Sequence, residues 1–155
     1  MTSFLILNDD LLTLNFLTFN NSIINDYFSF FIKILICLSA SIYFFFIANF
    51  LKEQKLIAFE YLLLILFAIL GLLLMCSSND LLTAYLTIEL ASFPLYILAS
   101  FKKTSSFSID SGIKYFITGA ITSSFYLLGS SFIYGFTGSI NFSDFYSLSN
   151  SFIYT

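Results

Sequence analysis

The chain has 155 residues, of which 59% are hydrophobic and only 10% are charged, and its mean hydropathy is +0.94. Soluble domains carry about 25% charged residues, so this composition predicts an integral membrane protein that contacts membrane lipids. A net charge of −3 on such a chain gives no indication of a nucleic-acid partner, and we expect none. The sequence has no His, and its two Cys residues stand apart in apolar runs. We therefore expect no bound metal and no cofactor on this chain.

Residues 1–26 combine short apolar pieces with Asn, Thr and Asp. None of these pieces can cross a hydrocarbon layer of about 30 Å, so we expect a tail that lies on the membrane surface or against a partner. Longer apolar runs follow, and we predict four transmembrane helices, over residues 27–51, 56–77, 80–101 and 109–136. A polar and aromatic tail would then occupy residues 137–155. The predicted fold class is all-α integral membrane, with a four-helix region over residues 27–136.

Polar residues mark the ends of these predicted helices. The run from Lys52 to Lys55 (KEQK) is typical of a turn between antiparallel helices. Asp80 directly precedes the third apolar run and is a candidate N-cap, since Asp accepts hydrogen bonds from the first free N–H groups of a helix. By the same reasoning, Ser108 or Asp110 would cap the fourth helix.

Lysines gather on one side of this topology. The first and third loops must lie on the same side of the membrane, and they contain Lys52, Lys55, Lys102 and Lys103. The opposite side receives Asp9, Asp10, Asp26, Asp80 and Asp144. Lysine-rich loops face the negative compartment, which would be a mitochondrial matrix or a bacterial cytoplasm. The abundance of Phe, Ile, Asn, Tyr and Lys indicates an AT-rich organellar gene, so we predict a multi-pass protein of the mitochondrial inner membrane.

Glu89 lies near the centre of the third predicted helix, where an ionisable group costs about 3 kcal/mol or more without compensation. Residues three, four and seven positions away share its helical face, and these are Tyr85, Ser92 and Tyr96. The result is a stripe of hydroxyl groups centred on a carboxylate. Such a stripe can hold water and solvate a proton carrier.

Two further residues belong to this hypothesis. Pro94 gives no N–H to the carbonyl of Leu90, and the freed carbonyl needs water or another partner. The alternative is that Pro94 only bends the helix for packing and that Glu89 is hydrogen-bonded structurally to a neighbour. Lys114 is a second charge inside a predicted span, with Thr118 on its face. A lysine so close to a helix end could equally extend to the membrane surface.

Two runs of sequence resemble a known family. The run from Leu81 to Lys102 (LLTAYLTIELASFPLYILASFK) is similar to the glutamate-bearing helix of subunit 2 of respiratory NADH:ubiquinone oxidoreductase, or complex I. The run from Gly112 to Gly138 (GIKYFITGAITSSFYLLGSSFIYGFTG) is similar to the helix that follows it in that family. One departure is Thr87, where many members have glycine.

The resemblance implies part of an antiporter-like helix bundle in a proton-translocating subunit. Glu89 would be the carboxylate of the proton path, and Lys114 would match the lysine that opens the next helix. The whole complex would be the enzyme, and NADH oxidation and ubiquinone reduction would take place on other subunits. Two alternatives remain: a piece of a multisubunit sodium/proton antiporter, or a purely structural assembly subunit.

Family members have many more helices than this chain. We therefore expect either a fragment or a split subunit whose remaining helices come from a second polypeptide, together with other membrane-arm subunits as partners. Gly119 and Ser123 form a pair of small residues four positions apart, which lets another helix approach closely. We expect this small-residue face and the stripe around Glu89 to meet helices of that second chain.

Overall fold

The computed structural model describes residues 17–18, 21–54 and 58–145. Four helices make up most of this part of the chain: α2 (Tyr27–Gln54), α3 (Ala58–Met75), α4 (Leu81–Ala99) and α5 (Ser106–Thr137). Two short strands, β1 (Leu17–Thr18) and β2 (Ile23–Ile24), precede them. Lys55, Asp9, Asp10 and the end of the predicted C-terminal tail lie outside the described residues.

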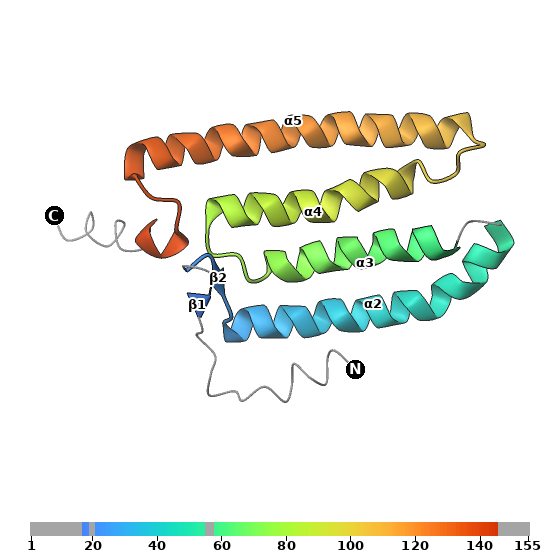
Figure 1. Ribbon diagram of the computed structural model, residues 1–155, viewed down its shortest axis with the longest axis horizontal. Helices are drawn as coiled ribbons and strands as arrows, with labels where there is room; N and C mark the ends of the chain where they lie inside the picture. Colours follow the sequence, from blue (N-terminus) through green and yellow to red (C-terminus); the bar gives the residue numbers. More distant parts are fainter. Residues whose placement is uncertain (1–16, 19–20, 55–57, 146–155) are drawn as a thin grey trace.

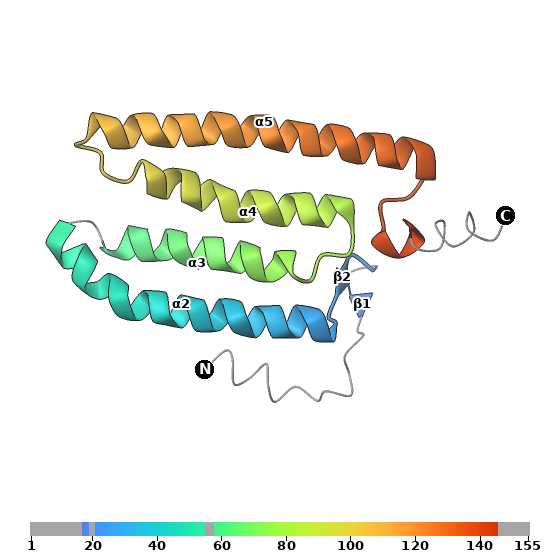
Figure 2. The same cartoon turned by 180° about the vertical axis from the view of Figure 1, so that it is seen from behind.

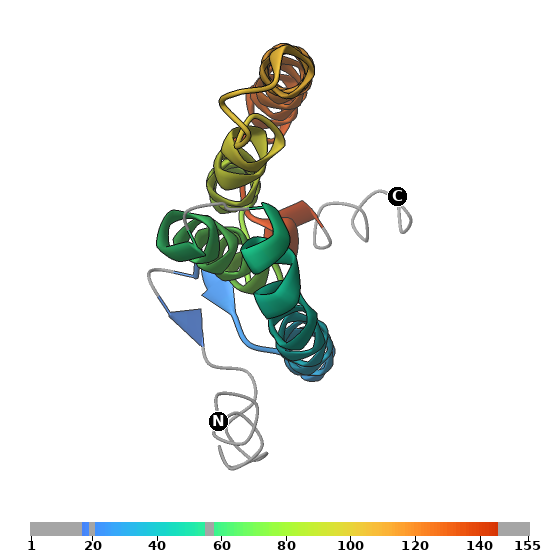
Figure 3. The same ribbon diagram turned by 90° about the vertical axis from the view of Figure 1, so that its right-hand side faces the viewer.

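The helices lie side by side in one layer, in the order α2, α3, α4, α5, with neighbours antiparallel (Figures 1 and 2). The end-on view confirms that the layer does not close into a ring (Figure 3). The most extensive contacts join α3 to α4, followed by those between α4 and α5. Because α4 takes part in both of these interfaces, it is the most extensively packed helix of the layer.

Small residues let α3 and α4 approach closely. Ala68, Ala84 and Ala91 are among the most buried apolar residues. A Cβ atom placed on Gly71 of α3 would lie 2.5 Å from the backbone nitrogen of Ala91 on α4. The two backbones therefore meet at a point where only glycine fits. This is the small-residue packing expected of membrane helices, which lack a hydrophobic force between them.

The turn between α3 and α4 joins three distant segments. The backbone N–H of Asn79 donates to the carbonyl of Ser22 (2.9 Å), and its side-chain amide donates to the carbonyl of Asn21 (2.8 Å). On the other side of the turn, Leu81 donates to the carbonyl of Ile140 (3.0 Å). Asn79 is only 6% exposed. This turn thus fixes the entry to α2 and the exit from α5 at one end of the layer.

The segment before α2 contains a feature that a purely helical prediction omits. β1 and β2 pair antiparallel, with Leu17 opposite Ile24 and Thr18 opposite Ile23. Asn21 adopts a positive φ of 70° in the connection, a conformation that Asn tolerates better than most residues. The strand ladder continues as a bridge from Ile23 to Ser78 in the α3–α4 turn.

The structure corrects the predicted start of the fourth helix and the predicted first turn. The N-cap of α5 is Ser105, so Ser108 and Asp110 are helical. Ser108 instead donates to the carbonyl of Ala99 (3.0 Å) at the end of α4, which draws the start of α5 back toward that helix. Similarly, α2 continues through Gln54 and includes most of the predicted KEQK turn, because Lys, Glu and Gln are good helix formers.

Asp80 is confirmed as the N-cap of α4, with extended backbone angles. Its backbone N–H donates to the Thr83 hydroxyl (3.2 Å), which is the return bond of a capping box. Asp80 also pairs with Asn141 in a β-bridge. The start of α4 is therefore tied both to its own first turn and to the segment after α5.

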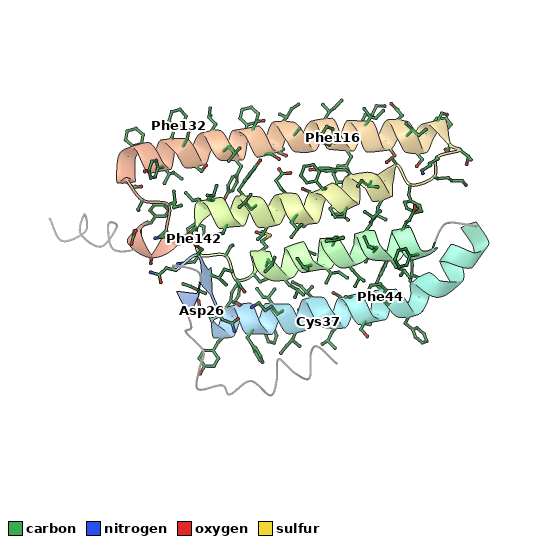
Figure 4. The ribbon with its side chains drawn as sticks, in the orientation of Figure 1. Asp26, Cys37, Phe44, Phe116, Phe132 and Phe142 are labelled. Carbon is green, nitrogen blue, oxygen red and sulfur yellow. The ribbon has the colours of Figure 1, made fainter. Side chains whose placement is uncertain are left out.

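In the described residues, three helical segments are long and apolar enough to cross a membrane: 27–47 of α2, α4 and α5. The fourth helix, α3, is apolar but shorter, at 18 residues. Large apolar side chains such as Phe132 point outward from the layer, on the side of α5 away from α4 (Figure 4). The chain is thus a helical membrane protein, and a fourth crossing remains a prediction.

We predict that Gly71→Ala destabilises the contact between α3 and α4. The new methyl group overlaps the backbone of Ala91, and overpacking of this kind costs about 1–3 kcal/mol. The thermal midpoint of the purified membrane complex that contains this chain should fall. Gly135→Ala is the matched control, because a Cβ there meets nothing within 4 Å in this chain. Equal midpoints for the two variants would contradict the close approach of the helices.

Candidate functional site

Glu89 points from the middle of α4 toward α5, where its Oε1 atom accepts a hydrogen bond from the hydroxyl of Ser123. Both side chains are half-buried. The Ser123 hydroxyl also lies 2.9 Å from the carbonyl oxygen of Gly119, one turn earlier on α5. The carboxylate therefore has a partner on the neighbouring helix, as a charge at this depth requires.

The hydroxyl stripe of α4 and residues of α5 line one pocket of about 170 Å³. Its lining consists of Tyr85, Ile88, Glu89, Ser92, Tyr96, Thr122, Ser123 and Tyr126. The four stripe residues grouped by helical phase thus share a single cavity. At about 30 Å³ of liquid volume each, a few water molecules fit beside the carboxylate.

Aromatic rings bound this pocket along the helix axis. One turn before Glu89, the ring of Tyr85 stacks on that of Tyr126 with 6.0 Å between centroids. Two turns after Glu89, the ring of Tyr96 meets the edge of Tyr115 at 4.8 Å. Phe116 adds a second ring beside Tyr96 at 5.8 Å (Figure 4). The pocket therefore lies between two pairs of packed aromatic rings.

Gly119 leaves room on α5 for the ring of Tyr96. A Cβ atom on Gly119 would lie 2.0 Å from the hydroxyl oxygen of Tyr96 and 2.5 Å from its ring carbon Cζ. The small-residue face of α5 thus packs against the stripe around Glu89 on α4. The prediction that the stripe and this face meet helices of another chain is wrong at Gly119 and Ser123, because the two surfaces pack against each other within this chain.

Pro94 is buried inside α4, and the helix continues past it to Ala99. The ribbon of α4 changes direction in its second half (Figure 1), as proline in a helix interior produces. Pro94 is not among the residues that line the pocket around Glu89. A hydrating role for the freed carbonyl of Leu90 therefore remains a prediction.

Lys114 lies apart from Glu89 in this structure. Its Nζ atom contacts Asp110 Oδ2 at 2.6 Å, and the two side chains are 73% and 60% exposed. Ser123 is nine positions after Lys114, which is about 13 Å along α5 at 1.5 Å per residue. Thr118 lies between them, and its hydroxyl donates back to the carbonyl of Lys114 (3.0 Å).

Ser123 and Tyr126 are members of the site that the sequence interpretation did not assign to it. Ser123 was interpreted as a packing residue because of its size. Tyr126 continues the series Lys114, Thr118 and Thr122 at intervals of four residues, and that spacing was the available signal. Its hydroxyl donates to the carbonyl of Leu81 (3.1 Å) and so ties α5 to the start of α4.

Among the described residues, no group of three or more His, Cys, Asp or Glu side chains is arranged to hold a metal ion. The chemistry of the site is that of one carboxylate, several hydroxyl groups and a small polar cavity. These groups can bind water and exchange protons. By fold and site, the chain is a helical membrane protein with a hydrogen-bonded carboxylate between two of its helices.

Comparison with known proteins shows what this chain is similar to. Residues 78–153 match the family model described as "NADH:quinone oxidoreductase/Mrp antiporter, TM". The chain is 42% identical over 151 residues to NADH-quinone oxidoreductase subunit N of Pelagibacter ubique, covering 97% of this chain and 32% of that protein. It is 43% identical over 128 residues to NADH-ubiquinone oxidoreductase chain 2 of Marchantia polymorpha, covering 83% of this chain and 26% of that protein.

These findings confirm the resemblance of the two runs around Glu89 and Lys114: the chain is a relative of subunit N, or chain 2, of the NADH:quinone oxidoreductases. It spans about a quarter to a third of the length of the curated relatives it matches. Part of a chain in the structure of an archaeal respiratory complex, the membrane-bound sulfane sulfur reductase, has a similar fold. The TM-score is 0.66 at 21% identity, covering 83% of this chain and 27% of that chain.

We predict that Gly119→Ala disrupts the site by displacing Tyr96. The added methyl group occupies the position of the tyrosine hydroxyl, so the ring must leave α5 and lose its contact with Tyr115. The cost should be about 1–3 kcal/mol, measured as a lower thermal midpoint of the complex.

Gly129→Ala is the control for this prediction, since a Cβ at that position on α5 meets nothing within 4 Å in this chain. An unchanged midpoint for Gly119→Ala would show that α4 and α5 do not pack as described.

Proposed function

We propose that this chain is the proton-translocating part of a subunit 2-type protein in the membrane arm of respiratory complex I, with Glu89 as the carboxylate that takes up and releases the proton. The observation that carries the proposal is the position of Glu89 in a polar pocket between α4 and α5, hydrogen-bonded to Ser123. An intramembrane acid in such a cavity is a functional group by default. The names of the relatives supply the class of complex.

The other residues have supporting roles in this proposal. Tyr85, Ser92 and Tyr96 line the pocket beside the carboxylate from α4. Thr118 and Lys114 are polar residues of α5 between the pocket and the end of the layer that contains Lys102 and Lys103. Lys114 acts as a second proton-path residue only if water or a rearrangement joins it to the pocket, because the two charges are separated along α5.

A complete path requires helices that this chain does not supply. The relatives are about three to four times longer than the part matched here. We propose that the remaining helices come from a second polypeptide, and that α3 crosses the membrane with α2, α4 and α5. In this proposal, NADH oxidation and ubiquinone reduction take place on other subunits, and this chain carries no redox group.

The orientation of the chain follows from its charges. Lys52 at the end of α2, together with Lys102 and Lys103 after α4, belongs to one end of the layer, and Asp26 and Asp80 belong to the other (Figure 1). The positive-inside rule places the lysine-rich end in the mitochondrial matrix. The protein would then be a multi-pass component of the inner membrane.

A piece of a multisubunit sodium/proton antiporter is the second candidate. The observation in its favour is the description of the matching family model, which covers Mrp antiporters as well as NADH:quinone oxidoreductases. It would use the same carboxylate without NADH. A purely structural assembly subunit is the third reading, in which Glu89 only stabilises the packing of α4 against α5.

Glu89→Gln separates these candidates, because it keeps the shape of the side chain and removes its charge. We expect the complex to assemble, since an amide oxygen still accepts a hydrogen bond from Ser123. NADH-driven proton pumping by reconstituted vesicles should fall at least about tenfold, because a positioned proton-transfer group contributes about 10²–10⁴-fold.

Glu60→Gln is the matched control, because Glu60 is an exposed carboxylate near the start of α3. Pumping at the wild-type rate by Glu89→Gln would refute the proton-path role. Loss of assembly with normal pumping by the residual complex would favour the structural subunit. A proton flux that requires sodium and not NADH would favour the antiporter.

A further inference from the structure

We infer that Ser123 is a positioning residue whose hydroxyl reverses its hydrogen bond when Glu89 gains or loses a proton. Glu89 would then remain hydrogen-bonded in both charge states. This inference rests on the proposed function, because a reversible partner matters to a carboxylate that is protonated and deprotonated in turn. It assigns to α5 a role in the chemistry of a residue on α4.

The geometry around Ser123 offers two acceptors to one donor. Its Oγ atom contacts Glu89 Oε1 across the helix interface and lies 2.9 Å from the Gly119 carbonyl oxygen on its own helix. A serine hydroxyl has one hydrogen to donate and two lone pairs that accept. It can therefore donate to only one of the two oxygens at a time.

When Glu89 is charged, the Ser123 hydrogen points to the carboxylate. This bond is the stronger choice, because hydrogen bonds to an ionised acceptor exceed those between neutral groups. The Gly119 carbonyl is not left alone, since the Thr122 hydroxyl donates to it at 2.7 Å. In the charged state, the carboxylate and the Gly119 carbonyl therefore each accept a hydrogen bond from a hydroxyl group.

When Glu89 is neutral, its new O–H donates to the lone pair of Ser123, and the Ser123 hydrogen rotates to the Gly119 carbonyl. The proton that neutralises Glu89 comes from the pocket, and Ser123 keeps its own hydrogen throughout. No buried polar group loses its partner, which would otherwise be destabilising. Rotation of a hydroxyl requires no movement of either helix.

Other groups that face the carboxylate cannot replace Ser123. The titratable residues that line the pocket are Tyr85, Tyr96 and Tyr126, and no lysine or second carboxylate is among its lining residues. The Ser92 hydroxyl donates to the backbone carbonyl of Glu89 (3.2 Å) and not to its carboxylate. Residues of α3 do not line the pocket. Among the described residues, Ser123 is the side chain that bonds the carboxylate directly.

The test is an infrared titration of Glu89 in the assembled complex, with its protonated carbonyl band identified as the one lost in Glu89→Gln. Ser123→Ala removes the donor to the charged form, so the carboxylate binds its proton more tightly. The midpoint of the band should move to higher pH by about one unit, a tenfold change in the protonation equilibrium. Ser123→Thr keeps the hydroxyl and should return the midpoint to the wild-type value.

Ser124→Ala is the matched control. Ser124 is the adjacent residue on α5, but it is exposed and its hydroxyl donates to the Ala120 carbonyl (2.8 Å), so the midpoint should not move. If Ser123→Ala does not assemble, Ser123→Cys, with similar volume and a weaker donor, should shift the midpoint in the same direction by less.

A wild-type midpoint in Ser123→Ala, or an equal shift in Ser124→Ala, would overturn the inference. A Ser123→Thr variant that titrates like Ser123→Ala would also overturn it. Failure of the proposed function has a different signature: Glu89→Gln would then pump normally, while the infrared midpoint would still report whether Ser123 bonds the carboxylate.

Discussion

A carboxylate in the middle of a membrane helix has to be hydrogen-bonded, and the arrangement of α4 and α5 follows from that requirement. Glu89 accepts a hydrogen bond from Ser123. The two residues can meet because small residues on α5 let the stripe of α4 approach closely. Gly119 is essential to this approach, since any side chain there would occupy the position of the Tyr96 hydroxyl. The same packing that satisfies the charge also creates the pocket around it.

The rest of the layer holds α4 in the position that the site needs. On its far side, α4 is set against α3 by the contact between Gly71 and Ala91. At one end, the turn around Asn79 ties the entry to α2 and the segment after α5 to the start of α4. These restraints fix both the height and the rotation of α4. The contact between Glu89 and Ser123 therefore depends on the position in which α3 and the turn around Asn79 hold α4.

Helical phase was sufficient to group Tyr85, Glu89, Ser92 and Tyr96, because residues on one helix are related by a fixed rotation. Composition and the cap at Asp80 were sufficient to locate α4. The partner of the stripe was not predictable in the same way. Which helix faces which depends on tertiary packing, so Ser123 was interpreted only as a small residue, and the stripe was assigned to a partner outside this chain.

The strand pair and the start of α5 could not be predicted from the sequence for a related reason. The β1–β2 pair is completed by a bridge from Ile23 to Ser78, more than fifty residues away, and local propensity carries no information about that contact. Ser105, and not Ser108, occupies the N-cap position of α5, and the Ser108 hydroxyl donates to the Ala99 carbonyl of α4. Both features involve contacts between different elements of the fold.

Glu89 bonds Ser123 on α5 of its own chain and helps to line the small pocket between α4 and α5. A cryo-electron microscopy map of the assembled complex, at a resolution that shows ordered water, tests this arrangement most directly. The map should show continuous density between the Glu89 and Ser123 side chains, with water beside the carboxylate and the Tyr96 hydroxyl next to Gly119. A Glu89 side chain directed at lipid, or bonded only to a helix of another polypeptide, would contradict it.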